Sequence, residues 1–309
     1  MVYHTKSKHI LPKITDRLSF LYIDHSTINR KDYSLTVNSN YGQAAIPANI
    51  INTLLLGPGV SMTHRAIELA TKSGVSLIWV GTHGAKCYST VRPLSTNTKF
   101  LERQAKYSTH RNHRIRVARE MYAMRFDDDV STHTMQQLRG KEGTRMKKIY
   151  RTHAKEYGIE WHGRQYDPND FSSGDLINRS LSIANDILYA VCLGVVSSLG
   201  MSNGLGFVHA GHSQSFIYDL ADLYKADTSI PIAFQVASSI VDENDLQNEL
   251  RTAMRKVFKD MNIAKRMIGD ICTLFDIESD DKDSVKAMFL WDDRVNLVEY
   301  GVNYSKVGV

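Results

Sequence analysis

The sequence predicts an α+β protein in which a small β-rich N-terminal domain with one helix precedes a larger all-α domain. Short apolar or alternating runs bounded by turn residues fill the first 90 residues, whereas apolar residues recur at helical spacing from about residue 97. The length of 309 residues also suits two domains of roughly 150 residues each. We therefore expect domains at residues 1–92 and 93–309, with a variable tail from about residue 276.

In the N-terminal domain, the predicted strands lie at residues 18–23, 33–37 and 75–80. The last of these runs, VSLIWV, is β-branched and aromatic and lies between Gly74 and Gly81, which are typical turn residues. One helix is predicted at residues 63–72, because its sequence THRAIELATK is helix-like and Gly74 follows it.

In the second domain, helical spacing predicts helices at residues 100–126, 134–157, 175–199, 215–226 and 246–263. Pro231 and the acidic stretch 242–245 are expected to separate the last two helices. The tail begins with an acidic run and becomes strand-like at residues 295–300.

Composition excludes several classes of protein. With 42% hydrophobic and 23% charged residues, the chain is neither disordered, collagen-like nor a coiled coil. Cys87, Cys192 and Cys272 are far apart and form no CxxC pair, which argues against a disulfide scaffold and a zinc ribbon. The first residues lack an apolar signal core, and no uninterrupted apolar run reaches about 18 residues, so we expect a cytoplasmic protein without a membrane span.

Positive charge is concentrated in one region. Residues 99–164 contain 16 Lys and Arg against 8 Asp and Glu, a net of +8, so the remainder of a chain with net charge +5 carries −3. Such a segment suits a polyanion-binding surface, because Lys and Arg that bind phosphates release condensed counterions. A solvated basic helix face would give the same count, so charge alone leaves both interpretations open.

Glu142 is the first candidate site residue, because it shares a face of the predicted helix with apolar residues such as Met146. A buried carboxylate must be neutralised, paired or bound to a metal. Gly140 and Gly143 flank it, and each costs roughly 1 kcal/mol in a helix, so we expect something to approach the backbone closely there. The alternative is a core glutamate paired with Arg or Lys.

Asp219 and Asp222 are three residues apart, so their carboxylates share one helix face. His209 lies just upstream in a glycine-rich segment that permits tight turns. Together with Glu142 these residues supply oxygen and imidazole ligands, which suit Mg²⁺ or Mn²⁺ and phosphoryl-transfer chemistry. The alternatives are a solvated acidic face and a satisfied core histidine.

Four segments together resemble the catalytic subunit of the CRISPR adaptation complex, the spacer-acquisition integrase, in its type I-E form. They are QLRGKEGTRMK (137–147), WHGRQYDPNDF (161–171), GFVHAG (206–211) and SFIYDLADLYKAD (215–227). The resemblance covers nearly the whole chain and implies a sandwich-like N-terminal domain and an α-helical catalytic domain. It further implies a homodimer, with two such dimers around a dimer of the small second adaptation subunit.

The resemblance implies that Glu142, His209 and Asp222 bind the metal and that Asp219 is an essential acidic neighbour. The implied reaction is a transesterification, in which the 3′-OH of prespacer DNA attacks a phosphodiester at the edge of a CRISPR repeat next to the leader. By analogy, the expected DNA contacts are Lys86, Arg139, Arg145, Arg164, Tyr166, His212, Tyr218 and Lys225, with His212 replacing a lysine of the family pattern.

Two other functions fit the same residues. A stand-alone metal-dependent endonuclease acting on branched or single-stranded DNA would use water in place of the 3′-OH. A non-enzymatic DNA-binding scaffold would be indifferent to metal chelation and would have Glu142 paired with a nearby arginine.

Overall fold

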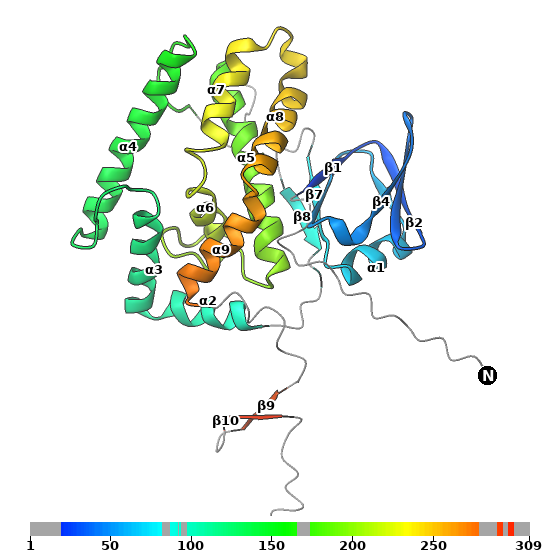
Figure 1. Ribbon diagram of the computed structural model, residues 1–309, viewed down its shortest axis with the longest axis horizontal. Coiled ribbons are helices and arrows are strands. Elements are labelled where there is room, and N and C mark those ends of the chain that lie inside the picture. Colours follow the sequence, from blue (N-terminus) through cyan, green and yellow to red (C-terminus); the bar gives the residue numbers. More distant parts are fainter. Residues whose placement is uncertain are drawn as a thin grey trace, which may run out of the picture.

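The computed structural model describes residues 20–81, 87–91, 93, 98–165 and 174–277, and the backbone of residues 289–292 and 296–299. The strand-rich N-terminal part lies beside the helical part, and α5 runs through the middle of the helices (Figure 1). The fold class is as predicted.

Two four-stranded sheets form the N-terminal part. The first has the order β1 (Leu21–Ile23), β5 (Thr53–Leu56), β7 (Ser76–Val80), β8 (Cys87–Val91). In that sheet only the β7–β8 pair is antiparallel. The second has the order β4 (Gly42–Pro47), β3 (Ser34–Ser39), β2 (Ser26–Lys31), β6 (Ser61–Met62), with only the β2–β6 pair parallel.

One buried apolar cluster joins both sheets and helix α1 (His64–Lys72). It includes Ile28 and Leu35 from the second sheet and Leu54 and Leu77 from the first. The strands predicted at 33–37 and 75–80 correspond to β3 and β7, and the helix predicted at 63–72 corresponds to α1. The strand predicted at 18–23 contains β1 at its C-terminal end. Strand β5 was not predicted, because all four of its side chains are buried and its sequence TLLL therefore shows no alternation.

The helical part contains α2 (Lys99–Thr109), α3 (Arg111–Ala123), α4 (Met135–Glu156), α5 (Leu176–Ser198), α6 (Ser215–Ala221), α7 (Ser229–Ser239), the 3₁₀ turn η4 (Glu243–Asp245), α8 (Leu246–Asp260) and α9 (Ile263–Phe275). Helix α4 begins with a capping box between Thr134 and Gln137, and Asp175 caps α5 by accepting a hydrogen bond from the backbone amide of Asn178. These caps explain why both helices begin where the sequence predicts.

Two helix predictions need correction, and two helices, α7 and α9, were not predicted. The helix predicted at 100–126 is two helices, because His110 adopts an extended conformation between α2 and α3. The helix predicted at 215–226 ends at Ala221 and continues as turns. Helix α7 was not predicted, because Pro231 suggests a break; it lies in the first turn, where no intrahelical N–H bond is lost.

Helix α5 is the core of the helical part. It is long and apolar enough by composition to cross a membrane, yet 89% of its most apolar window is buried inside the protein. It packs against α6, α7, α8 and α9. Near the C-terminus, β9 (Phe289–Asp292) pairs antiparallel with β10 (Asn296–Glu299), close to the strand predicted at 295–300.

Candidate active site

Asp219 organises the loop that carries His209. Its side chain is 0% exposed, and it accepts hydrogen bonds from the backbone amides of Phe207 (2.5 Å), Val208 (3.0 Å) and His209 (2.9 Å). The loop passes close to α6 to do so: a Cβ at Gly206 would lie 2.8 Å from Cβ of Ser215, the first residue of α6, and 2.6 Å from the carbonyl oxygen of His209. Glycine at this position is therefore a steric requirement of the loop.

The same carboxylate orients the His209 ring. Nδ1 of His209 lies 2.7 Å from Oδ1 of Asp219. This hydrogen bond raises the pKa of His209 above its usual value, against the opposing effect of partial burial. With Nδ1 bonded to Asp219, Nε2 is the nitrogen that could bind a metal, which is the usual histidine arrangement in metal sites. Asp219 therefore acts on the site through His209, because its own oxygens are occupied by the loop.

Asp222 is the C-cap residue of α6 and is paired with a lysine. Its Oδ1 lies 2.7 Å from Nζ of Lys225. Burial opposes ionisation of the carboxyl, but the charges of Lys225 and Arg125 outweigh burial and lower the pKa of Asp222. Lys225 is also stacked over the ring of Tyr189, 5.0 Å from its centroid. Asp222 is therefore held as a carboxylate.

Glu142 lies on the partly buried face of α4, as predicted. Its side chain is 15% exposed, and Oε1 lies 3.4 Å from Nη1 of both Arg125 and Arg145. Oε2 is buried and has no hydrogen-bond partner among the described residues. The close approach expected at Gly140 and Gly143 is not made by the described chain itself: apart from the adjoining backbone of α4, none of its atoms lies within 4 Å of a Cβ placed at either glycine.

Electrostatic interactions connect these groups into one site. The charge of Arg125, the partner of Glu142, acts on Asp222, and Asp222 in turn acts on His209. The pKa of Tyr122 is raised by burial and also by the charges of Glu142 and Asp222. The structure thus brings His209 and Asp219 into direct contact, and it links Glu142 and Asp222 to them through their charges and through Arg125.

The residue types fit a hard divalent cation, but the ligands are not drawn together. The carboxylates of Asp222 and Glu142 and the imidazole of His209 form a donor set that suits Mg²⁺ or Mn²⁺, and Oε2 of Glu142 has no hydrogen-bond partner among the described residues. Within the described ranges, however, no three His, Cys, Asp or Glu side chains are close enough to hold a metal. Arginines contact Glu142 and Lys225 contacts Asp222 instead.

The predicted DNA contacts differ in how freely they could reach DNA. Arg139 is exposed on α4, and its Nε donates to the carbonyl of Met135. Arg145 contacts Glu142, as described above. Arg164 is tied to α5 through Oδ1 of Asn178 (2.9 Å) and Oγ of Ser182 (2.8 Å). Arg164 therefore anchors the segment before residue 166 to the core helix.

The aromatic and histidine contacts lie around the start of α6. His212 is exposed, and its ring lies 5.3 Å from that of Tyr218, which also packs edge-on against Tyr189 at 5.2 Å. Lys86 and Tyr166 lie outside the described residues.

Arg125 is the main residue of the site that the sequence did not reveal. It sits just after α3, in the apolar sequence MYAMRF, and its side chain is only 3% exposed. An arginine among apolar residues one turn after Tyr122 was the available signal. Arg114, whose Nε donates to the carbonyl of Phe207, was missed in the same way.

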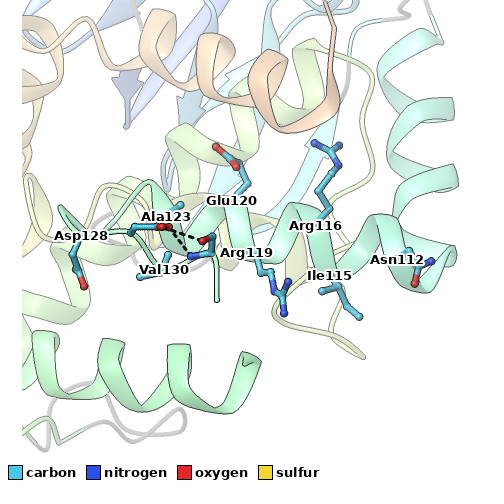
Figure 2. A pocket seen from close by; sticks show the side chains of 10 residues that line it. Asn112, Ile115, Arg116, Arg119, Glu120, Ala123, Asp128 and Val130 are labelled. Carbon is cyan, nitrogen blue, oxygen red and sulfur yellow. Dashed lines mark hydrogen bonds between the residues drawn. The ribbon is translucent and has the colours of Figure 1, made fainter. Parts of the chain in front are cut away.

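A cavity of about 630 Å³ lies between α3 and the residues that follow it (Figure 2). Its lining mixes Arg116 and Arg119 with Glu120 and Asp128, so it has no strong charge of one sign. A smaller cavity of about 230 Å³ adjoins the candidate site, because Arg139 and Val208 line it. The larger cavity contains none of the predicted site residues.

Comparison with known proteins identifies the family. The family model described as CRISPR associated protein Cas1 matches residues 20–128 and 124–268. The chain belongs to the Cas1 family. This confirms the resemblance found in the sequence, and with it the expectation of an enzyme from a nuclease and integrase family.

Two Cas1 relatives are each named CRISPR-associated endonuclease. The protein of Clostridium sp. (strain SY8519) is 46% identical over 296 residues, covering 96% of this chain and 98% of the relative. That of Escherichia coli (strain K12) is 34% identical over 257 residues, covering 82% of this chain and 84% of the relative.

Solved structures agree with the fold. The crystal structure of TtCas1 superposes with a TM-score of 0.76 at 32% identity, covering 84% of this chain and 98% of that one. A TtCas1–DNA complex gives a TM-score of 0.68 at 34% identity, covering 86% of this chain and 99% of that one. A casposase bound to integration product shares the fold, with a TM-score of 0.62 at 17% identity over 84% of this chain and 91% of that one.

Proposed function

We propose that this Cas1 family member is a metal-dependent DNA integrase of CRISPR adaptation, which joins the 3′-OH ends of prespacer DNA to a CRISPR repeat by transesterification. The observation that carries this proposal is that Asp222 interacts electrostatically both with His209 and with Arg125, the partner of Glu142, within a chain whose positive charge is concentrated around Glu142. The family and the DNA complex of a relative support a DNA substrate.

In this proposal Glu142, His209 and Asp222 hold Mg²⁺ or Mn²⁺. When bound, such an ion polarises a phosphate oxygen and favours an ionised attacking hydroxyl. Asp219 fixes the tautomer and direction of the His209 ring through Nδ1. Lys225 keeps Asp222 ionised, and exposed arginines such as Arg139 bind the DNA backbone.

The proposed assembly is a homodimer, two of which flank a dimer of the small second adaptation subunit, with prespacer and repeat DNA as substrates. We place the enzyme in the cytoplasm, where the DNA of a bacterial or archaeal cell is found; the relatives named above are bacterial.

The test combines the full chain, the small second subunit, a prespacer ending in 3′-OH and a supercoiled plasmid that carries a repeat. Joined strands should form with Mn²⁺ or Mg²⁺ and disappear with a chelator. His209→Ala should reduce joined product by about 100-fold or more while DNA affinity stays within about twofold, because backbone contacts supply most of the affinity. Unchanged joining by this variant would overturn the site assignment.

A prespacer ending in 3′-dideoxy is the matched substrate control. An integrase gives no joined product with it, whereas the alternative, a stand-alone endonuclease, nicks DNA equally well with either end. The relatives' name, endonuclease, favours keeping this alternative in the test. The pairing of Glu142 with two arginines is the arrangement that a non-enzymatic scaffold predicts. DNA binding that the chelator does not change, with neither joined nor nicked product, would support that function.

A further inference from the structure

Arg125 is a buried cation beside the predicted metal ligands. Its side chain is 3% exposed and lies between the ring of Tyr122, 5.0 Å from the centroid, and the carboxylate of Glu142. A buried charge is costly unless a charge of the opposite sign lies beside it, so Arg125 needs an anionic partner at this position.

The contact between Arg125 and Glu142 is loose for a buried ion pair. Arginine usually binds a carboxylate with two parallel hydrogen bonds. Here one nitrogen, Nη1, approaches one oxygen at 3.4 Å, and Nε and Nη2 of Arg125 have no hydrogen-bond partner within the part of the chain that the structure describes. Oε2 of Glu142 likewise has no hydrogen-bond partner among the described residues. Arg125 therefore places a positive charge beside Glu142 without fixing the position of its carboxylate.

The charge of Arg125 also reaches Asp222, the second predicted carboxylate ligand. Arg145 contacts the same oxygen of Glu142 at the same 3.4 Å, but its side chain is 27% exposed, so solvent screens its charge more. Of the two arginines that contact Glu142, Arg125 is therefore the one whose charge is less screened, whereas Lys225 is the direct partner of Asp222.

We propose that Arg125 is the resident counter-cation of Glu142: it balances this carboxylate in the metal-free enzyme and thereby lowers the affinity of Glu142 for a divalent cation. The inference rests on the proposed function, because it takes Glu142 as a metal ligand. Since like charges repel, a divalent ion that enters beside Arg125 binds less tightly than it would without it.

The experiment measures Mn²⁺ binding and thermal unfolding of the full chain, without DNA, for the wild type and three variants. Arg125→Gln removes the charge, Arg125→Lys keeps it, and Arg145→Gln is the matched control at the same distance from Glu142. Arg125→Gln should bind Mn²⁺ about tenfold more tightly, whereas the other two should stay within about threefold of the wild type.

Thermal unfolding separates this role from a merely structural one. Arg125→Gln should unfold at a lower temperature in chelator, and Mn²⁺ should raise its Tm by more than it raises that of the wild type. Weaker or unchanged Mn²⁺ binding by Arg125→Gln, or an equal loss of Tm with and without Mn²⁺, would overturn the proposal. No Mn²⁺ binding by the wild type would instead overturn the proposed function.

A double variant covers the case in which Arg125→Gln does not fold. If the charge of Glu142 is what Arg125 balances, then Arg125→Gln combined with Glu142→Gln should fold, because no unpaired carboxylate remains. Failure of the double variant to fold as well would assign Arg125 a packing role and contradict the inference.

Discussion

Asp219 and Glu142 are acidic side chains of the same candidate site, but they are bonded in opposite ways. Asp219 is fully buried and accepts three backbone hydrogen bonds while also contacting His209. Glu142 has two long contacts through one oxygen, and its other oxygen has no partner among the described residues. One half of the site is therefore fixed by the fold, whereas the other keeps a carboxylate oxygen without a partner among the described residues, as the proposed metal ligand requires.

The largest expected effect on stability and on Mn²⁺ affinity follows substitution of Asp219, the carboxylate that the fold holds in place. Asp219→Asn should lower the free energy of unfolding by about 3–5 kcal/mol, since it removes the charge from a buried carboxylate that accepts several hydrogen bonds. Mn²⁺ affinity should fall by about 10–100-fold, because His209 loses its orientation. Urea unfolding and Mn²⁺ titration measure the two effects.

Asp270 offers the control for this prediction, because its carboxylate accepts a hydrogen bond from the hydroxyl of Tyr224. Asp270→Asn should lower stability while leaving Mn²⁺ affinity unchanged. If Asp219→Asn also leaves Mn²⁺ affinity unchanged, the loop is not positioned by Asp219 in the way described.

A similar contrast, between a side chain held by the core helix and an exposed one, separates two of the predicted DNA-binding arginines. Arg164→Ala should destabilise the chain by about 1–3 kcal/mol, because Asn178 and Ser182 lose a charged donor. Arg139→Ala should change the free energy of unfolding by no more than about 0.5 kcal/mol, since this side chain is exposed. It should, however, lower the slope of log affinity for DNA against log salt concentration by about the amount that one phosphate contact contributes. Thermal unfolding and fluorescence anisotropy at several salt concentrations distinguish them; the reverse pattern would contradict the comparison.

The smallest effect concerns pH. The Asp219 hydrogen bond raises the pKa of His209, and this protonated pair stabilises the metal-free fold at low pH and is lost as pH rises through the folded-state pKa. A metal needs the neutral imidazole, so Mn²⁺ affinity should fall by about tenfold per pH unit below that pKa. When Mn²⁺ affinity is measured at a series of pH values, Asp219→Asn should move the pH at which affinity begins to fall to a lower value. An unchanged pH would count against the His209–Asp219 pair.

Local patterns predicted the elements with strong periodicity or caps. Thr134 and Asp175 begin α4 and α5 where expected, and the apolar run VSLIWV forms β7. Elements that depend on their neighbours were missed: β5 is buried on both faces and shows no alternation. The break at His110 was missed as well, because basic residues continue through it at helical spacing.

By itself the sequence predicted the order of the β-rich and helical parts from periodicity, the family from the resemblance of its motifs, and Glu142, His209, Asp219 and Asp222 as candidate site residues from residue type and spacing. Only the tertiary structure decided what each carboxylate does. Asp219 bonds a loop ten residues upstream, while Glu142 meets Arg125 from the end of another helix. Such pairings depend on how α3, α4 and α6 pack in three dimensions, which spacing along the chain does not encode.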